Sequence, residues 1–105
     1  MSDAIARYQK MLDQNPTNEF AHFSMGKALY DAGDFLTAKK HFEAALENKP
    51  TWMVVQILIG KCELSLGNRD LARRAFEKGR QLAVDQAHDG PREEMEQMLA
   101  ELEED

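Results

Sequence analysis

The chain has 105 residues, of which 43% are hydrophobic and 30% are charged, and its formal net charge is −6 at pH 7. The length leaves no room for a second domain or a long linker, and the apolar content excludes a disordered chain, so we expect one small domain with a packed core. The acidic balance, without a basic face that carries interleaved aromatic residues, argues against a nucleic-acid partner.

Two further features exclude other classes. Cys62 is the single cysteine and has no partner for an internal disulfide or a zinc site, which is typical of a reducing compartment. The first residues lack a basic start followed by an apolar run, and no uninterrupted apolar stretch approaches about 18 residues. We therefore expect a soluble, cytoplasmic protein with no membrane partner.

Parts of the sequence recur at a fixed distance of about 34 residues, which is a sign of a solenoid built from helical hairpins. The recurring pairs are Pro16-Thr17 with Pro50-Thr51, Gly26-Lys27 with Gly60-Lys61, Gly33 with Gly67, Ala38 with Ala72, and Phe42-Glu43 with Phe76-Glu77. Function then becomes a question about the surface that these hairpins make.

The first three helices follow from apolar spacing and from residues that stop helices. Residues 3–14 carry apolar side chains at helical spacing before Asn15-Pro16 ends the segment. A helix over about 19–32 follows, capped by Thr17 or Asn18. A third helix is expected over about 35–48.

The next hairpin contains an ambiguity that the repeat resolves. Residues 52–59 are apolar and rich in β-branched side chains, and local propensity alone predicts a buried strand. Gly60 stands where Gly26 stood, however, so the segment should be helical to about residue 66, with Thr51 repeating the cap. A fifth helix is predicted over about 69–83.

The last segment departs from the repeat. Val84 stands where a proline is expected, and residues 85–90 are predicted to form a longer loop. Pro91 suits the first turn of a final helix. The apolar stripe of that helix is Met95, Met98, Leu99 and Leu102. We expect this helix to cover the apolar face of the last hairpin, so that a chain cut after Gly90 should be poorly soluble or unfolded.

With these residues in view, the chain resembles the tetratricopeptide repeat family, as a small single-domain member of the bacterial type. The matching residues of the first full unit are Met25, Gly26, Leu29, Ala38, Phe42, Ala45 and Pro50; those of the second are Ile59, Gly60, Ala72 and Phe76. His22 and Gln56 stand where the pattern prefers Trp, and Glu63 stands at the Tyr position.

The resemblance implies an all-α fold, an αα superhelix. It would consist of a half repeat at 3–16, two repeats at 19–50 and 53–83, and a capping helix at 91–104. The small residues would lie where the helices of a hairpin approach each other closely.

The resemblance also implies that the first helix of each unit lines a concave groove. Carried over residue by residue, the partner-binding positions are Phe20, Phe23, Ser24, Lys27, Tyr30 and Asp31 in one helix, and Val54, Ile57, Leu58, Lys61, Leu64 and Ser65 in the next. An apolar floor with two lysines suits an extended or helical peptide that carries apolar anchors and a carboxylate. Phe23 and Leu58 occupy places where family members that clamp chaperone tails use polar groups, so that subset is not resembled.

No catalytic, cofactor-binding or metal-binding residue and no cofactor is predicted. His22, His41 and His88 fall on three different elements without the spacing of metal ligands, and Cys62 is interpreted as a small buried thiol. The function predicted is a module for protein–protein interaction, not an enzyme. The alternative is a self-assembling subunit, a homodimer through the groove or through the N-terminal helix, because a large exposed apolar surface is unusual on a monomer.

Overall fold

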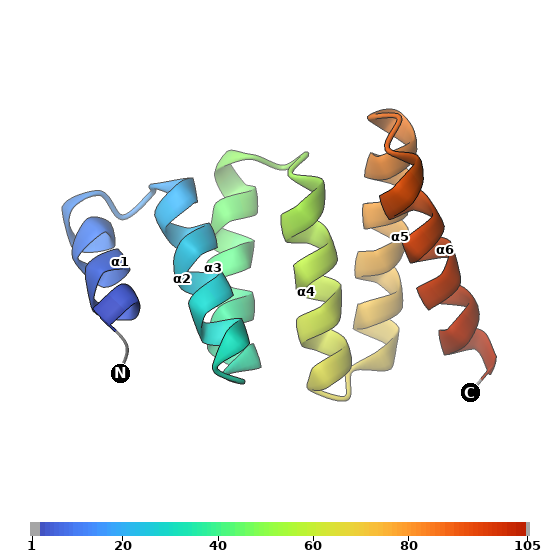
Figure 1. Ribbon diagram of the computed structural model, residues 1–105, viewed down its shortest axis with the longest axis horizontal. Coiled ribbons are helices and arrows are strands. Elements are labelled where there is room, and N and C mark those ends of the chain that lie inside the picture. The colour runs from blue at the N-terminus through green and yellow to red at the C-terminus, as the bar shows by residue number, and fades with distance from the viewer. Residues whose placement is uncertain (1–2, 105) are drawn as a thin grey trace. The chain divides into compact units, whose positions relative to one another are not determined.

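The computed structural model describes residues 3–104, and six helices make up this part of the chain (Figure 1). They are α1 (Asp3–Gln14), α2 (Glu19–Asp31), α3 (Phe35–Asn48), α4 (Met53–Ser65), α5 (Arg69–Asp85) and α6 (Asp89–Glu104). Two compact units can be distinguished, residues 1–50 with α1 to α3 and residues 51–105 with α4 to α6. The all-α prediction is confirmed, including a helix where local propensity favoured a strand.

The helix starts follow the repeat, although one predicted cap is wrong. The Asn18 side chain accepts hydrogen bonds from the backbone N–H groups of Phe20 and Ala21, both at 3.1 Å, and so caps α2. The equivalent residue in the second unit is Trp52, which is the N-cap of α4 and makes no side-chain capping bond. Thr51 lies one residue too early to cap this helix.

Three helix ends share one turn geometry, in which a residue in the left-handed region reverses the chain. Gly33 (φ 85°) and Gly67 (φ 82°) end α2 and α4, and Ala87 (φ 57°) does the same after α5. Without a proline at position 84, α5 continues to Asp85, and the predicted end at residue 83 and loop over 85–90 are therefore wrong. Pro91 lies in the first turn of α6, as predicted.

Glycine allows a phenylalanine ring to pack against the backbone in both hairpins. A Cβ atom on Gly26 would lie 2.5 Å from Cε1 of Phe42, and one on Gly60 would lie 2.4 Å from Cε1 of Phe76. No real side chain tolerates such a separation, so any larger residue would have to displace the ring. The close approach predicted at Gly26 is confirmed.

Each unit has its own apolar cluster. In the first, Leu12 of α1 packs with Ala21 and Met25 of α2. In the second, the buried members are Met53, Ile57, Ala72, Phe76, Ala83, Met95 and Leu102. Met95 and Leu102 belong to α6, so the last helix covers an apolar face of the α4–α5 hairpin.

Candidate partner-binding site

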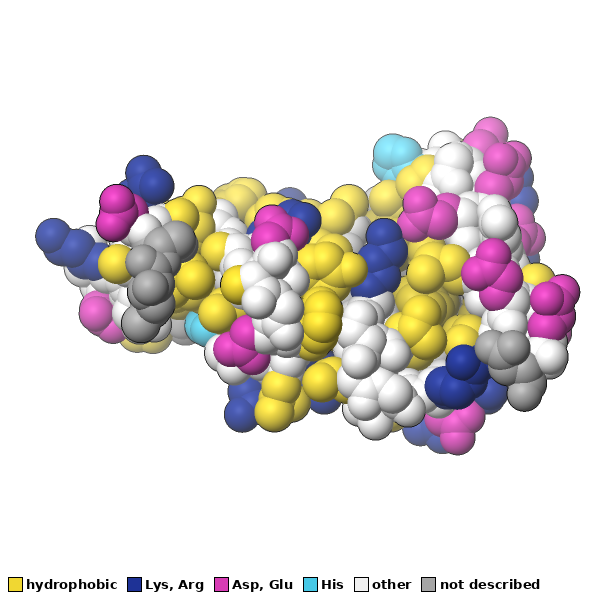
Figure 2. Space-filling model, turned by 60° about the horizontal axis from the view of Figure 1, so that its bottom comes forward, with side chains coloured by type: hydrophobic (Ala, Val, Ile, Leu, Met, Phe, Trp, Pro, Cys, Tyr) yellow, Lys and Arg dark blue, Asp and Glu magenta, His cyan; other side chains and the backbone are white. Residues whose placement is uncertain are grey.

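The second unit contains a hollow of about 470 Å³ between α4 and α6. Its lining residues are Met53, Val54, Ile57, Leu58, Lys61, Gly90, Pro91 and Glu94. Figure 2 shows hydrophobic side chains on the floor of this hollow and charged side chains on its rim. The floor can therefore receive an apolar group, while the rim offers polar contacts.

Four of the six positions predicted on α4 line this hollow, whereas Leu64 and Ser65 do not. Val54 is 46% exposed, whereas Ile57 and Leu58 are 8% exposed each. Ile57 also belongs to the core cluster, so most of its side chain is structural. Leu64 does not line the hollow and instead packs against the core. Val54 is thus the apolar lining residue that a substitution can change with least damage to the fold.

The contribution of α6 to the hollow was not foreseen from its sequence, which predicted only a helix that covers the last hairpin. Gly90, Pro91 and Glu94 form the second wall of the hollow. A signal was present, because α6 begins at Asp89, slightly more than one repeat period of about 34 residues after α4 begins at Met53. The last helix therefore takes the sequence position of the first helix of a further unit.

An ion pair lies on the rim of the hollow. The Nζ atom of Lys61 lies 3.7 Å from Oε1 of Glu94, and the side chains of Lys61 and Glu94 are 35% and 53% exposed, respectively. The lysine expected to bind a partner carboxylate thus already has one from its own chain. An exposed pair of this kind is worth only about 0–1 kcal/mol, so it can open when a partner arrives.

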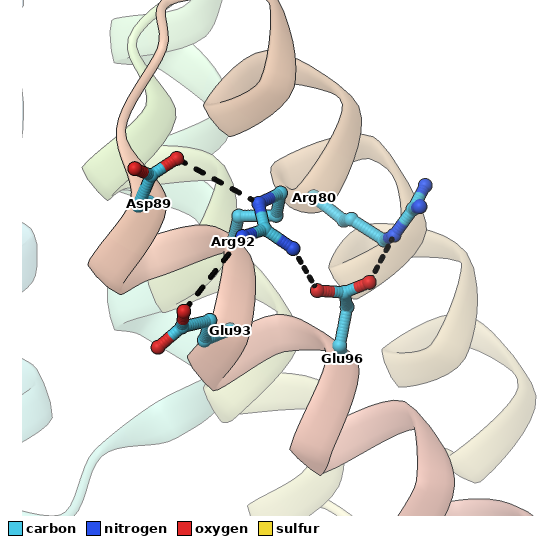
Figure 3. A network of polar contacts seen from close by, with 5 residues as sticks. All are labelled: Arg80, Asp89, Arg92, Glu93 and Glu96. Carbon is cyan, nitrogen blue, oxygen red and sulfur yellow. Dashed lines mark hydrogen bonds and ion pairs between the residues drawn. The ribbon is translucent and has the colours of Figure 1, made fainter.

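The other acidic residues near the start of α6 are engaged elsewhere (Figure 3). Arg92 contacts Asp89 at 3.9 Å, Glu93 at 3.7 Å and Glu96 at 2.6 Å. Arg80 of α5 contacts the second oxygen of Glu96 at 3.6 Å. Because this network holds its own acids, Glu94 is the carboxylate that α6 presents to the hollow.

In the first unit, the predicted aromatic positions of α2 contact other parts of the same unit. Phe20 is 59% exposed, and the Lys49 ammonium lies 5.7 Å from its ring centroid. The Phe23 ring lies 6.3 Å from that of Phe42, and Ser24 is half-buried. Phe20 is therefore the most accessible of the predicted apolar positions on this helix.

The polar end of the predicted α2 surface is also internally paired. Nζ of Lys27 lies 3.3 Å from Oδ1 of Asp31 and 5.5 Å from the ring centroid of Tyr30. Tyr30 in turn packs edge-on against Phe35, with 5.4 Å between ring centroids. Both lysines predicted for partner binding thus have a carboxylate neighbour within their own unit.

A polar link joins the two helices of each hairpin at equivalent repeat positions. Nδ1 of His22 lies 3.0 Å from Nδ1 of His41, and Nε2 of His22 lies 2.8 Å from the carbonyl oxygen of Pro16. In the second unit, Gln56 donates from Nε2 to the carbonyl oxygen of Ala75 at 3.4 Å. Both first-helix residues stand where the family pattern prefers Trp, and each links its helix to the second helix of the hairpin through a polar atom.

Acidification is expected to destabilise the first unit through His41. Burial, and secondarily the neighbouring His22, lowers the pKa of His41 below its ordinary value of 6.5. Between these two pKa values the unfolded chain binds more protons, so the stability is complete above pH 6.5 and falls as the pH drops towards the folded pKa. Urea unfolding of the wild type and of His41→Ala over this pH range measures the effect. Parallel pH profiles for the two proteins would contradict it.

A metal site with three or more protein ligands and a membrane-spanning helix both find no support within residues 3–104. No group of three or more His, Cys, Asp or Glu side chains in this part of the chain is placed to hold a metal ion. Nor does any helix described there have the length and apolar character needed to cross a bilayer. The hollow of the second unit is therefore the candidate site that the geometry favours.

The recurrence of helical hairpins, each with a glycine under a phenylalanine ring, defines the class of helical-repeat proteins. Within this class, residues 19–52 match the model of the tetratricopeptide repeat. The TPR repeat-containing protein PA0015 of Pseudomonas aeruginosa is 31% identical over 98 residues, which cover 93% of each chain. This chain belongs to the tetratricopeptide repeat family.

Solved structures agree with this assignment. Protein BPP2914 from Bordetella parapertussis is 30% identical, with a TM-score of 0.85 over 99% of this chain and 90% of that one. PcrH in complex with the chaperone binding region of PopD is 21% identical and has a TM-score of 0.88 over 95% of this chain and 76% of that one. The TPR2B domain of yeast Sti1 in a complex with pHsp70 (16% identity, 96% and 81% of the chains) has a TM-score of 0.84. The last two likenesses concern the fold alone.

Proposed function

We propose that this chain is a protein-interaction module whose hollow between α4 and α6 receives an apolar side chain from a partner's segment. The main observation behind this proposal is the hollow itself. Its volume of about 470 Å³ lies within the range of about 300–1,000 Å³ that is typical of ligand pockets. The exposed Val54 at its mouth would be covered by the partner, which adds apolar contact area.

The rim supplies the polar part of recognition. A carboxylate next to the partner's apolar anchor takes the place of Glu94 beside Lys61. The exchange costs little because the Lys61–Glu94 pair is partly exposed. The first unit also combines an apolar group with an ion pair. On α2 these are the exposed Phe20 and the Lys27–Asp31 pair.

Two neighbouring folds support the proposal. PcrH was solved with the chaperone binding region of PopD, and the TPR2B domain of Sti1 was solved with pHsp70. A fold of this kind therefore takes protein segments as partners. We infer the carboxylate beside the partner's apolar anchor from Lys61 and Glu94 of this chain and not from those complexes.

Selection of displayed random peptides on the purified chain, followed by affinity measurement, tests the proposal. Selected peptides should carry a bulky apolar residue near an acidic one. Val54→Glu should weaken their binding at least about tenfold, because the new carboxylate lies at the mouth of the apolar hollow and next to the partner's acid. Val84→Glu is the matched control, since Val84 is 43% exposed on α5 and does not line the hollow. Equal affinities for wild type and Val54→Glu would overturn the proposal.

Self-assembly remains the second candidate, because α1 also presents a surface hollow. Its volume is about 350 Å³, and the lining residues are Ile5, Ala6, Gln9, Lys10 and Asp13. Met11 on the same helix is 39% exposed. If the chain sediments as a dimer that Met11→Glu dissociates, and no peptide is selected, the self-assembling subunit replaces the partner-binding module.

A further inference from the structure

We infer that His22 and His41 form a binding site for a divalent transition-metal ion, such as Zn²⁺, that clamps α2 to α3. Imidazole nitrogen is a preferred ligand of Zn²⁺, Cu²⁺ and Ni²⁺. The two Nδ1 atoms lie 3.0 Å apart, although 19 residues separate them in the sequence. The ion would occupy the position between these two nitrogens, with its remaining coordination positions filled by water.

The distances suit a shared ion. Two Zn–N bonds of about 2.0–2.1 Å at a tetrahedral angle place the nitrogens about 3.3 Å apart and the ring centres about 5.2 Å apart. The observed ring centroids are 5.3 Å apart, with an angle of 36° between the ring planes. The helices therefore keep their spacing. The rings need only pivot about their soft terminal torsions until both lone pairs meet at the ion.

The hydrogen-bond partner of His22 prepares its Nδ1 atom for a metal. The carbonyl oxygen of Pro16 only accepts, so Nε2 of His22 carries the hydrogen and Nδ1 keeps a lone pair. Metal-binding histidines usually donate their other ring nitrogen to a carbonyl or carboxylate in this manner. On binding, the hydrogen of His41 moves from Nδ1 to Nε2, so no proton is lost from a neutral pair.

The segment that carries the Pro16 carbonyl is itself fixed. Nδ2 of Asn48, at the end of α3, donates a hydrogen bond to the carbonyl oxygen of Thr17. Both rings are half-buried, so they are held by packing and still have a side open to water. A positioned pair of this kind binds an ion more tightly than two mobile surface histidines.

The second unit has no metal-binding side chains at the positions equivalent to His22 and His41. Gln56 and Ala75 stand at the positions equivalent to His22 and His41, and a single hydrogen bond joins the helices there. A hairpin of this family thus needs no pair of histidines to stay closed. The variant His22→Gln/His41→Ala copies the second unit's residue pair into the first and is expected to fold without the metal site.

A calorimetric titration with Zn²⁺ near neutral pH, in a buffer that does not bind metals, tests the inference. The wild type should bind one ion per chain at this site. The variant His22→Gln/His41→Ala should lose about 100-fold or more in affinity, since even changes in outer-shell partners cost about 10–100-fold. His88→Gln should bind like the wild type, because His88 precedes α6 in the other unit. Equal affinity in the double variant and the wild type would overturn the inference.

Nuclear magnetic resonance of the histidine ring nitrogens in the wild type gives a second readout that does not depend on any variant. Zn²⁺ should shift the Nδ1 signals of His22 and His41 and leave those of His88 in place. Signals that stay unchanged at saturating Zn²⁺, or a shift confined to His88, would refute the site even if the double variant fails to fold.

Discussion

Replacing Phe76 with alanine is expected to lower the free energy of unfolding by about 3–5 kcal/mol. The side chain is fully buried in the core cluster of the second unit, and its ring lies against the backbone at Gly60. The glycine has no side chain that could move into the space left by the ring, so a cavity remains. A chain of this size has a total stability of about 5–15 kcal/mol. Urea unfolding followed by circular dichroism should show a much lower midpoint.

Further variants separate the ring–glycine contact from a general loss of core volume. Gly60→Ala adds a methyl group 2.4 Å from the ring, at a cost of about 1–3 kcal/mol, against a gain in helix propensity of about 1 kcal/mol. Combined with Phe76→Leu, it should cost less than the sum of the two single changes. Leu71→Ala, at an exposed position of α5, the helix that carries Phe76, should change the free energy of unfolding by no more than about 0.5 kcal/mol. A Phe76→Ala protein that unfolds at the wild-type urea concentration would contradict the packing described.

The repeat made the fold predictable where local propensity failed. Residues 52–59 are apolar and rich in β-branched side chains, but Gly60 in register with Gly26 indicated a helix, and α4 (Met53–Ser65) confirms it. The reason is physical: Gly60 and Gly26 each receive a phenylalanine ring from the second helix of their hairpin. A pattern spaced by one repeat thus carries information about tertiary contacts that a local window lacks.

The errors in helix bounds fall where the repeat ends. The absence of a proline at position 84 was interpreted as the start of a loop. Proline ends helices, however, and without one α5 continues to Asp85. Ala87 then adopts the left-handed conformation that Gly33 and Gly67 adopt earlier, and this role of an alanine has no signal in the sequence. Boundaries set by the absence of a residue are harder to predict than those set by its presence.

The candidate site was only partly predictable. The apolar positions of α4 followed from the family resemblance, but Glu94 lies outside the repeats, and so its pairing with Lys61 was not foreseen. The approach of His22 to His41 was also missed, since each was considered on its own helix. A groove shared by α2 and α4 stays a prediction.

Removing α6 is expected to have a still larger effect than any single substitution in the core. A chain cut after Gly90 loses Met95, which is fully buried, and Leu102, which is 8% exposed. Truncating a buried Met or Leu to alanine costs about 2–5 kcal/mol each, so the loss of both approaches the total stability of about 5–15 kcal/mol. The shortened chain should aggregate or lack a cooperative unfolding transition in circular dichroism.

The controls for this truncation decide what holds α6 in place. Arg80–Glu96 and Lys61–Glu94 are partly exposed pairs between helices, so Glu96→Gln should cost at most about 1 kcal/mol, and added salt should leave the full chain folded. Met95→Ala alone should cost about 2–5 kcal/mol. If the truncated chain instead unfolds cooperatively at the wild-type temperature, α6 contributes little burial energy. Its place beside α4 would then serve only to complete the hollow at which we expect a partner to bind.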